Sequence, residues 1–315
     1  MYNILVNDGL DKAAIDRLGL NGFKVSTQKY SQEDLAKHIH DYEVVVVRSA
    51  TKIGKAEIDY GSKLKLIVRG GVGIDNIDAR YAESKGITVC NTPLASSHSV
   101  AEMVFAHLFS GARFLHQSNR QMNLSGVTLF KELKSNYSKG IELSGKTLGI
   151  IGFGNIGMEV ARMALSLNMK VIAFDMFPKS VDLKIEFSNH QSLSFPIETI
   201  SKEEVIAHSD FISINVSGKE EVLNKNDFEK MKKGVGIINC ARGGVVNEND
   251  LIDYLNNGKI SFAGLDVFEN EPAPREDLLR HPQVSLTPHV AASTLEGQQR
   301  IAEEVADIII NFFKK

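Results

Sequence analysis

Short apolar runs rich in valine, isoleucine and leucine recur along the chain and alternate with longer amphipathic segments. Such alternation is typical of α/β proteins, in which helices cover both faces of a parallel sheet. Ten runs are candidate strands: residues 2–6, 43–50, 64–70, 88–93, 147–154, 170–175, 210–216, 234–240, 262–268 and 284–289. The first four lack a phosphate loop and the later group has one, so we predict an α/β fold of two doubly wound parallel-sheet domains.

A long helical segment is expected to join the two domains, with the sequence SSHSVAEMVFAHLFSGARFLHQ starting at Ser96. It opens with a capping box, Ser99 to Glu102, and then places apolar residues on more than one face. Such a helix needs cover on both sides, either between the domains or at a subunit interface. We favour the interface and expect a homodimer, with residues 120–145, which are polar and irregular, forming an extended arm.

Residues 294–313 follow one amphipathic pattern and predict a terminal helix. In two-domain chains of this kind such a helix often returns to the first unit. The predicted domains are therefore 1–95 with 291–315, and 96–290, the second including the helical segment and the arm.

Composition and charge exclude several classes of function. The 315 residues are 43% apolar and 24% charged, and a net charge of −3 without a basic block argues against nucleic acid as a partner. No run approaches the roughly 18 apolar residues of a membrane span, and the first residues carry no secretion signal, so we expect no membrane partner and a cytoplasmic protein. Two cysteines and nine histidines without metal-ligand spacing predict neither disulfides nor a metal site.

The strongest local signal is the sequence TLGIIGFGNIGMEVARMA, in which a strand, a glycine-rich turn and a helix follow one another. Glycines in such a turn let the backbone approach a pyrophosphate, and the helix N-terminus supplies donors. Asp175 ends the next strand, where a carboxylate accepts both ribose hydroxyls and repels a 2′-phosphate. We therefore predict NAD rather than NADP, bound by Asp175 and by the loop of Gly152, Phe153, Gly154, Asn155, Ile156 and Gly157.

Three later strands end in unusual polar residues, Arg242, Glu271 and His289. Ligands of parallel sheets bind beyond the carboxyl ends of the strands, so these residues are candidates for a substrate site. Each has a structural alternative: a surface arginine in a glycine-rich turn, one acid in an acidic loop, and a histidine that caps a helix. Together they would supply an anion binder, an orienting carboxylate and an acid/base.

Five co-linear motifs extend along most of the chain: GGVGIDNID (70–78), GFGNIG (152–157), NCARGGVVNENDL (239–251), LDVFENEP (265–272) and PHVAAST (288–294). With these motifs the chain resembles the NAD-dependent D-isomer-specific 2-hydroxyacid dehydrogenases, and within that family the D-3-phosphoglycerate dehydrogenases. The resemblance implies a Rossmann NAD-binding domain and a smaller, flavodoxin-like substrate domain. It also implies a short form of the enzyme, because many relatives append a serine-binding domain for which we expect no room here.

The resemblance implies specific roles for the residues at the strand ends. Arg242 is expected to bind the substrate carboxylate, His289 to be the acid/base, and Glu271, not Glu269, to pair with His289. Asp266 is expected to contact the nicotinamide amide. Further cofactor contacts are expected from Cys240, Ala241, His289 and Ala291.

The chemistry suits these residue types. When a 2-keto acid is reduced, hydride reaches the carbonyl carbon while negative charge develops on its oxygen, which a protonated His289 would neutralise. Arg242 offers a flat bidentate fork that lysine could not reproduce. Backbone donors of the loop Gly70 to Gly73, including Gly71, Val72 and Gly73, are expected to hold the substrate carboxylate from the other domain, so that the two domains clamp the substrate.

Two arginines of the first domain point to a phosphorylated substrate. Arg48, followed by Ser49 in the sequence RSATK, ends a buried strand, and Arg69 precedes the carboxylate loop. The segment RSATK closely resembles that of the phosphoglycerate enzymes. The alternative is that each arginine pairs with a surface carboxylate such as Glu43 or Asp75. A further basic residue from the arm, Lys131, Lys134 or Lys139, could complete a phosphate site.

Some features depart from the family pattern and keep other activities open. Asn215 and Ser217 stand where relatives usually have a His-x-Pro sequence, and the segment 176–209 is long enough for an extra turn or hairpin beside the adenosine. Glycerate, hydroxypyruvate and D-lactate remain alternative substrates. A different class, a non-enzymatic NAD-sensing protein like the C-terminal-binding corepressors, is the main rival to an enzyme.

Overall fold

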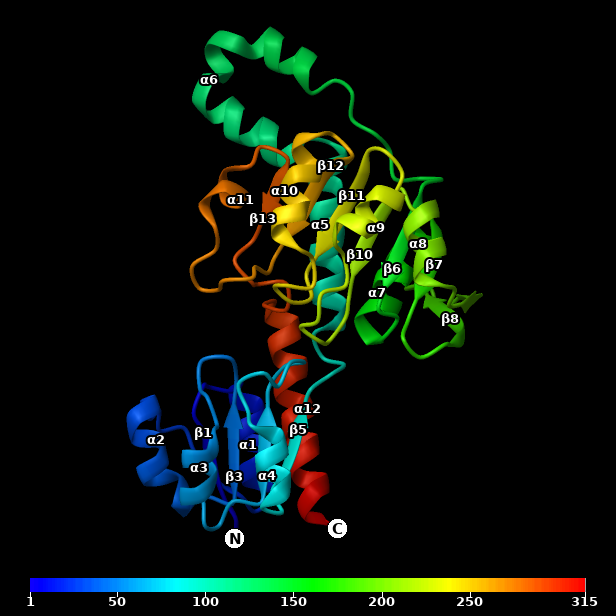
Figure 1. Ribbon diagram of the computed structural model, residues 1–315. Coiled ribbons are helices and arrows are strands. Elements are labelled where there is room, and N and C mark those ends of the chain that lie inside the picture. The colour runs from blue at the N-terminus through cyan, green and yellow to red at the C-terminus, as the bar shows by residue number, and fades with distance from the viewer. Residues whose placement is uncertain (315) are drawn as a thin grey trace. The chain divides into compact units, whose positions relative to one another are not determined.

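The computed structural model describes residues 1–314, which form two compact units (Figure 1). The first unit combines Met1–Ser97 with the segment that starts at Ala292, and the second is His98–Ala291. None of the helices in residues 1–314 has both the length and the apolar character that a membrane crossing needs.

The first unit is a five-stranded parallel sheet in the order β2-β1-β3-β4-β5. Its strands are β1 (Asn3–Val6), β2 (Lys24–Ser26), β3 (Val44–Val47), β4 (Leu66–Arg69) and β5 (Thr88–Asn91). Its helices are α1 (Lys12–Leu20), α2 (Gln32–His38), α3 (Lys55–Tyr60), α4 (Ala79–Ser84) and α12 (Leu295–Lys314), with a 3₁₀ turn η1 (Ile39–Asp41).

The central strands of this sheet are buried on both faces, because successive residues of a strand point to opposite faces and the runs 4–6, 44–47 and 66–68 are apolar and buried throughout. Ile4 and Val6 of β1 pack in a cluster with α1 and α12, whereas Leu5 packs in a second cluster with α2, α3 and α4. All four valines of β3 are buried. The terminal helix α12 thus packs on the first unit, as predicted.

The second unit is a six-stranded parallel sheet in the order β13-β12-β11-β10-β6-β7. Its strands are β6 (Thr147–Ile151), β7 (Lys170–Phe174), β10 (Phe211–Ile214), β11 (Val235–Asn239), β12 (Ile260–Leu265) and β13 (Val284–Leu286). Its helices are α5 (Ser97–Ala112), α6 (Leu115–Asn136), α7 (Asn155–Ser166), α8 (Lys202–His208), α9 (Lys225–Lys230), α10 (Glu248–Asn256) and α11 (Glu276–Arg280).

The strand order of this sheet reverses between β6 and β10, because the chain runs from β6 to β7 on one side and then crosses to β10 on the other. Such a switch point leaves a crevice outside the carboxyl ends of the two strands, where ligands of open α/β sheets bind. The predicted α/β fold with parallel sheets is confirmed, and each of the ten predicted runs overlaps a strand.

Two predictions in the connecting region are wrong. Helix α5 begins at Ser97, so Ser99 lies inside the first turn and does not cap the helix. The residues expected to form an extended arm are largely helical, because α6 continues to Asn136 with a kink at Leu129. This stretch contains no proline, and its four leucines and three lysines favour a helix although its polar and apolar residues follow no regular period. Figure 1 shows α6 projecting away from the sheet of its unit.

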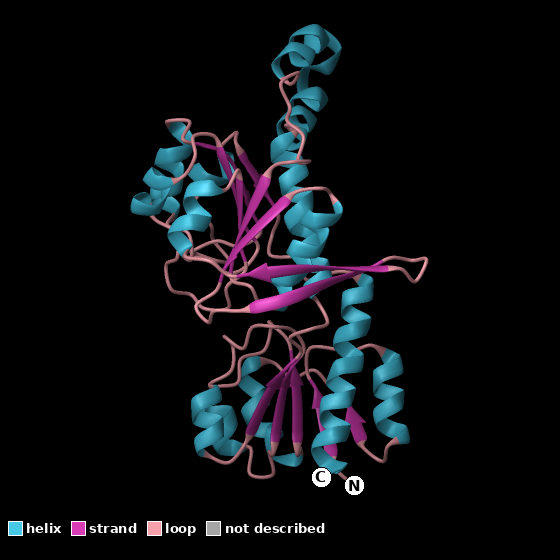
Figure 2. Ribbon diagram, turned by 90° about the vertical axis from the view of Figure 1, so that its right-hand side faces the viewer, coloured by secondary structure: helices cyan, strands magenta, loops and turns pink. Residues whose placement is uncertain are grey.

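The long segment after β7 forms a hairpin, one of the two structures that its length suggested. Strands β8 (Ser180–Glu186) and β9 (Ser192–Glu198) pair antiparallel, and a bridge from Ala173 to Thr199 ties the hairpin to β7 (Figure 2). Leu183 of β8 is fully buried. The hairpin is therefore a packed part of the second unit, beside the strand that ends at Asp175.

Candidate active site

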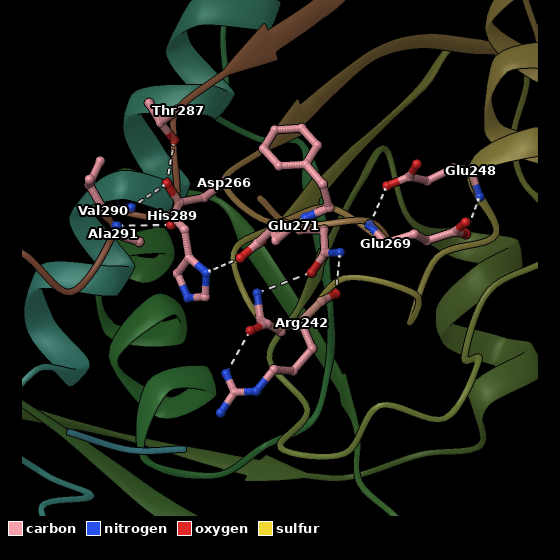
Figure 3. A network of polar contacts seen from close by, with 12 residues as sticks. Arg242, Glu248, Asp266, Glu269, Glu271, Thr287, His289, Val290 and Ala291 are labelled. Atoms are coloured by element: carbon pink, nitrogen blue, oxygen red, sulfur yellow. Dashed lines mark hydrogen bonds and ion pairs between the residues drawn. The ribbon is translucent and has the colours of Figure 1, made fainter. Parts of the chain in front are cut away.

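Three strands of the second unit end in the residues that the sequence marks as candidates. Arg242 follows β11, Glu271 follows β12, and His289 follows β13. Because β11, β12 and β13 are parallel neighbours, these three segments come from the same edge of the sheet. In Figure 3 the side chains of Arg242 and His289 extend to the same side of this edge.

His289 and Glu271 form a hydrogen-bonded pair. His289 Nδ1 is 2.7 Å from Glu271 Oε2, and the other carboxylate oxygen, Oε1, accepts a hydrogen bond of 2.9 Å from the Phe268 backbone N–H (Figure 3). The carboxylate is thus fixed at both oxygens and holds one ring nitrogen of His289. The other nitrogen, Nε2, is left to face a ligand. A pocket lined mainly by Phe268, Leu286 and three prolines adjoins the pair.

Asp266 holds the turn that carries His289. The Asp266 side chain is 1% exposed, and its Oδ1 accepts bonds from the Thr287 hydroxyl (2.5 Å) and the Val290 N–H (2.9 Å). Its Oδ2 accepts a 2.8 Å bond from the Ala291 N–H, and its backbone oxygen accepts one from the His289 N–H. His289 itself adopts a φ of +55°, a conformation that costs a non-glycine residue of order 1–3 kcal/mol and persists only when the surroundings enforce it.

Arg242 lies in a turn that is fixed by a buried side chain. Asn239, at the end of β11, accepts a bond from the Ala241 N–H and donates one of 2.9 Å to the Arg242 backbone oxygen. The Arg242 guanidinium donates from Nη1 to the Ala241 oxygen at 2.7 Å. Cys240, which follows Asn239, is buried. Burial raises the pKa of its thiol well above the usual value, so the thiol remains protonated.

Two acids that the sequence did not assign to the site join the Arg242 loop to the Glu271 loop. The Glu248 N–H donates to Glu269 Oε1 at 3.1 Å, and the Glu269 N–H donates to Glu248 Oε1 at 2.8 Å (Figure 3). Glu248 is 4% exposed, and burial, together with the Glu269 charge, raises the pKa of its carboxyl. We call this reciprocal pair the Glu248–Glu269 clasp. Glu269 thus bonds to Glu248. The carboxylate that contacts His289 is that of Glu271.

The glycine-rich loop lies at the switch point of the sheet. Gly152 has a φ of +91°, and a Cβ there would lie 2.8 Å from the backbone of Asn215 after β10. A Cβ on Gly157 would lie 2.2 Å from the Gly152 oxygen, so this glycine lets α7 pack closely on β6. A Cβ on Gly154, at the N-terminus of α7, would meet nothing within 4 Å. The protein's own packing explains the first two glycines but not Gly154, which leaves room for a ligand's phosphate.

Asp175 lies beside this loop and has a basic neighbour that the sequence analysis overlooked. Its carboxylate accepts bonds from the N–H groups of Phe153 and Phe177 and forms an ion pair of 3.0 Å with Lys179. Burial alone would raise the pKa of Asp175, but these bonds outweigh it and lower the pKa below its usual value. The Lys179 ammonium also donates to the Phe153 oxygen. Three residues separate Asp175 from Lys179, so no basic residue stands next to Asp175 in the sequence to indicate this pairing.

The loop 70–73 belongs to the first unit and packs against the arginine that precedes it. Gly71 has a φ of +139°, and a Cβ there would overlap the Arg69 guanidinium. Arg69 therefore folds onto its own loop. The loop is tied to the next strand, because Asn91 donates to the Val72 oxygen and the Thr92 N–H donates to the Gly71 oxygen.

Arg48 lines a pocket of about 300 Å³ in the first unit, together with Asp8, Asp11 and Gly70. The two acids are engaged elsewhere, because Asp8 accepts bonds from the Arg48 and Thr51 N–H groups and from the Thr51 hydroxyl, and Asp11 caps α1. Among residues 1–314 the Arg48 guanidinium forms no ion pair with Glu43 or Asp75, the partners that the structural alternative required. Ser49 beside it is exposed.

The second unit therefore combines an imidazole held by a carboxylate, an arginine in a fixed turn, and a glycine-rich loop at a helix N-terminus. An imidazole in this setting can give or take a proton, and a guanidinium can bind a carboxylate. Within residues 1–314 no group of three histidine, cysteine or acidic side chains could hold a metal ion.

Comparisons with known proteins agree on one family. Residues 105–291 match the model of the D-isomer specific 2-hydroxyacid dehydrogenase, NAD binding domain. The chain is 42% identical to a hydroxypyruvate reductase of Thermotoga maritima over 98% of this chain and 97% of that protein. It is 37% identical to a D-3-phosphoglycerate dehydrogenase of Archaeoglobus fulgidus over 99% of this chain, but it spans only 57% of that protein's length.

A solved structure shows the same two-domain fold. A glyoxylate reductase from Paecilomyes thermophila superposes with a TM-score of 0.84 and 26% identity, covering 100% of this chain and 96% of the other. The family model names NAD, the cofactor that the sequence predicts. From the motifs, the fold and these matches together, the chain belongs to the D-isomer specific 2-hydroxyacid dehydrogenase family and uses a nicotinamide cofactor.

Proposed function

We propose that the protein is an NAD-dependent enzyme that interconverts a three-carbon D-2-hydroxy acid and its 2-keto acid. The observation that carries the proposal is the pair of His289 and Glu271, with Nδ1 and Oε2 2.7 Å apart, at the sheet edge that also presents Arg242. A binding protein without catalysis would need no imidazole held in a strained backbone conformation by a buried carboxylate.

In this proposal each of the three residues has one task. Arg242 binds the substrate carboxylate through its guanidinium fork. His289 donates a proton from Nε2 to the carbonyl oxygen during reduction and removes the hydroxyl proton during oxidation. Glu271 keeps the ring oriented by accepting a hydrogen bond from Nδ1. The bound nicotinamide supplies the hydride acceptor or donor.

The second unit fits a dinucleotide. The open space at Gly154 and the N–H groups at the start of α7 suit a pyrophosphate, and Asp175 suits a ribose, provided that its bond with Lys179 is exchanged for ribose hydroxyls. Asp266, Cys240, Ala241 and Ala291 are proposed to line the nicotinamide end.

Within this class we propose 3-phosphoglycerate and 3-phosphohydroxypyruvate as the substrate pair. One support is Arg48, which lines a pocket and whose guanidinium forms no ion pair among the described residues. The other is the similarity to phosphoglycerate dehydrogenases. Arg69 packs on Gly71 and is a weaker candidate for a phosphate contact. The second candidate pair is glycerate and hydroxypyruvate, because the Thermotoga hydroxypyruvate reductase is matched over nearly its whole length.

We further propose a homodimer formed through α6. Leu124 is 85% exposed and Val127 fully exposed on this projecting helix, and Phe130 is also exposed. Apolar side chains on an unsupported helix are unfavourable in water, and a second copy of the same helix would cover them. The lysines of this region, Lys131 and Lys134, are candidates for phosphate contacts, as is Lys139 just beyond it.

Loss of the imidazole tests the acid/base role. His289→Ala should lower kcat for reduction by roughly 10²- to 10⁴-fold, as expected of a lost general acid. Glu271→Gln keeps an acceptor for the Phe268 N–H but removes the carboxylate that orients the His289 ring, so kcat should fall as well, by less than in His289→Ala. Glu269→Gln is the control, because it removes a nearby charge that does not contact His289. A His289→Ala enzyme with normal kcat in steady-state assays that are limited by chemistry would contradict the mechanism.

Cofactor preference tests Asp175. The unmodified protein should prefer NADH to NADPH, and Asp175→Ser should narrow that preference because the carboxylate no longer repels a 2′-phosphate. Lys179 would then be released toward the phosphate, so adding Lys179→Ala to Asp175→Ser should restore part of the preference. The measurement is kcat/KM for both cofactors, and equal use of both by the unmodified protein would refute the assignment.

The phosphate assignment is tested at Arg48. Arg48→Ala should raise KM for 3-phosphohydroxypyruvate roughly 10- to 100-fold, since a charge-assisted contact contributes about 1.5–3 kcal/mol, while KM for hydroxypyruvate should hardly change. Lys52→Ala, which removes an exposed cation of the same loop, is the control. If hydroxypyruvate is the better substrate of the unmodified enzyme, or both substrates suffer equally, the glycerate pair takes the place of the phosphorylated one.

The homodimer is tested on α6. Val127→Asp should convert a dimer to a monomer in light scattering, because a charge would be buried in the apolar contact. Ser125→Asp adds the same charge about half a turn away and should leave the dimer intact. A dimer that survives Val127→Asp at micromolar concentration would place the interface elsewhere.

A further inference from the structure

A buried histidine lies behind the candidate site, and none of the proposed steps uses it. His107 is on α5 and is 2% exposed. Burial lowers the pKa of His107 to about 4, although the nearby Asp266 charge acts in the opposite direction. The ring is therefore neutral at physiological pH, with a hydrogen on one nitrogen only.

Both ring nitrogens of His107 contact hydroxyl groups of the segment that leads to His289. Nδ1 is 2.9 Å from the Ser285 hydroxyl of β13, and Nε2 is 3.1 Å from the Thr287 hydroxyl. The Thr287 hydroxyl is in turn 2.5 Å from Asp266 Oδ1 (Figure 3). A continuous row of polar contacts thus runs from His107 through Thr287 to the carboxylate that fixes the His289 turn.

The direction of these bonds follows from the hydrogens available. The single hydrogen of the Thr287 hydroxyl is donated to the carboxylate of Asp266, which can only accept. The Thr287 oxygen is then an acceptor, so His107 Nε2 must carry the ring hydrogen and donate it. Nδ1 is left as an acceptor. The Ser285 hydroxyl satisfies it by donating its single hydrogen to Nδ1 at 2.9 Å rather than to the Ser110 oxygen, which lies 3.2 Å away. The neutral ring therefore has one tautomer that completes both contacts.

The sheet leaves room for this ring. A Cβ on Gly264 of β12 would lie 2.5 Å from His107 Cβ and 2.8 Å from its Cγ. No other residue could occupy position 264 without moving the imidazole. Gly264 thus provides the space that the His107 ring occupies, and it lies two residues before Asp266 in the sequence.

We propose that His107 is a positioning residue for His289, which acts by holding the Thr287 hydroxyl on the Asp266 carboxylate. The inference rests on the proposed role of His289 as the acid/base. Asp266 accepts from the Val290 and Ala291 N–H groups, and its orientation sets the turn in which His289 is held at positive φ. Without a donor at Nε2, the Thr287 hydroxyl is free to rotate away from Asp266. The Asp266 carboxylate then loses one of the donors that fix its orientation.

Two amide side chains separate the two contacts of the ring. Glutamine at position 107 can place its amide nitrogen near the position of Nε2 and keep the bond to Thr287, whereas asparagine reaches only the position of Nδ1 and keeps the contact with Ser285. His107→Asn should therefore lower kcat for 2-keto acid reduction by up to about 100-fold, the scale of a misplaced catalytic group, while His107→Gln retains most of it. Each variant loses one hydrogen bond, so their thermal unfolding midpoints should be similar.

Three readouts separate positioning from general destabilisation. In His107→Asn, KM for the keto acid should stay near its original value while kcat falls. The primary isotope effect with NADH deuterated at the transferred position should rise, because chemistry becomes slower. In a His289→Ala background, adding His107→Asn should cost almost nothing further, since residues that act through one another are not additive.

The outcomes distinguish the inference from the function on which it rests. Normal kcat in His289→Ala overturns the proposed function and the positioning role together. A large loss in His289→Ala, followed by an equal additional loss on His107→Asn, overturns the positioning role alone. So does equal activity of His107→Asn and His107→Gln. If His107→Asn does not fold, Thr287→Val and Thr287→Ser make the same comparison from the other side of the bond, and equal activity of these two also overturns the inference.

Discussion

The geometry of the candidate site depends on the hydrogen bonds of one buried carboxylate, that of Asp266. A carboxylate removed from water is stable only when its oxygens are bonded, and here they accept from one hydroxyl and two backbone N–H groups. Those donors all belong to residues 287–291, so satisfying the charge fixes the turn and with it His289. The strained backbone of His289 persists because releasing it would leave the carboxylate without partners.

This arrangement shows how a parallel sheet brings distant residues to one place. The loops after neighbouring strands emerge at the same edge, and each loop is then fixed by a side chain from within: Asn239 in the Arg242 turn, Glu271 against the Phe268 N–H, and Asp266 in the His289 turn. A rigid scaffold thus carries polar groups that are ordered before any ligand binds.

Much of the fold was predictable because buried parallel strands are continuous apolar runs. Polar residues at the ends of these runs marked the candidate site, and the resemblance then added their specific roles. The misses have physical causes. β2 is a three-residue edge strand without an apolar run, and α6 has helical propensity but no helical apolar period over most of its polar sequence. Contacts between residues far apart in the sequence, such as those of His107 with Thr287 and of Glu248 with Glu269, leave no local pattern. They become visible only when the strands are in register.

The Glu248–Glu269 clasp has a consequence for the heat resistance of the enzyme. Because the folded state raises the pKa of Glu248, it binds a proton there more tightly than the unfolded chain does. The resulting stabilisation is fully present below the unfolded-state pKa and is lost as the pH rises through the higher folded-state value. Above that folded-state value the clasp aligns two loops while carrying a buried negative charge that destabilises the fold. The same residue therefore orders the loops of the site and lowers the stability of the fold. Substitutions that neutralise the charge at position 248 are a route by which a more thermostable enzyme could arise.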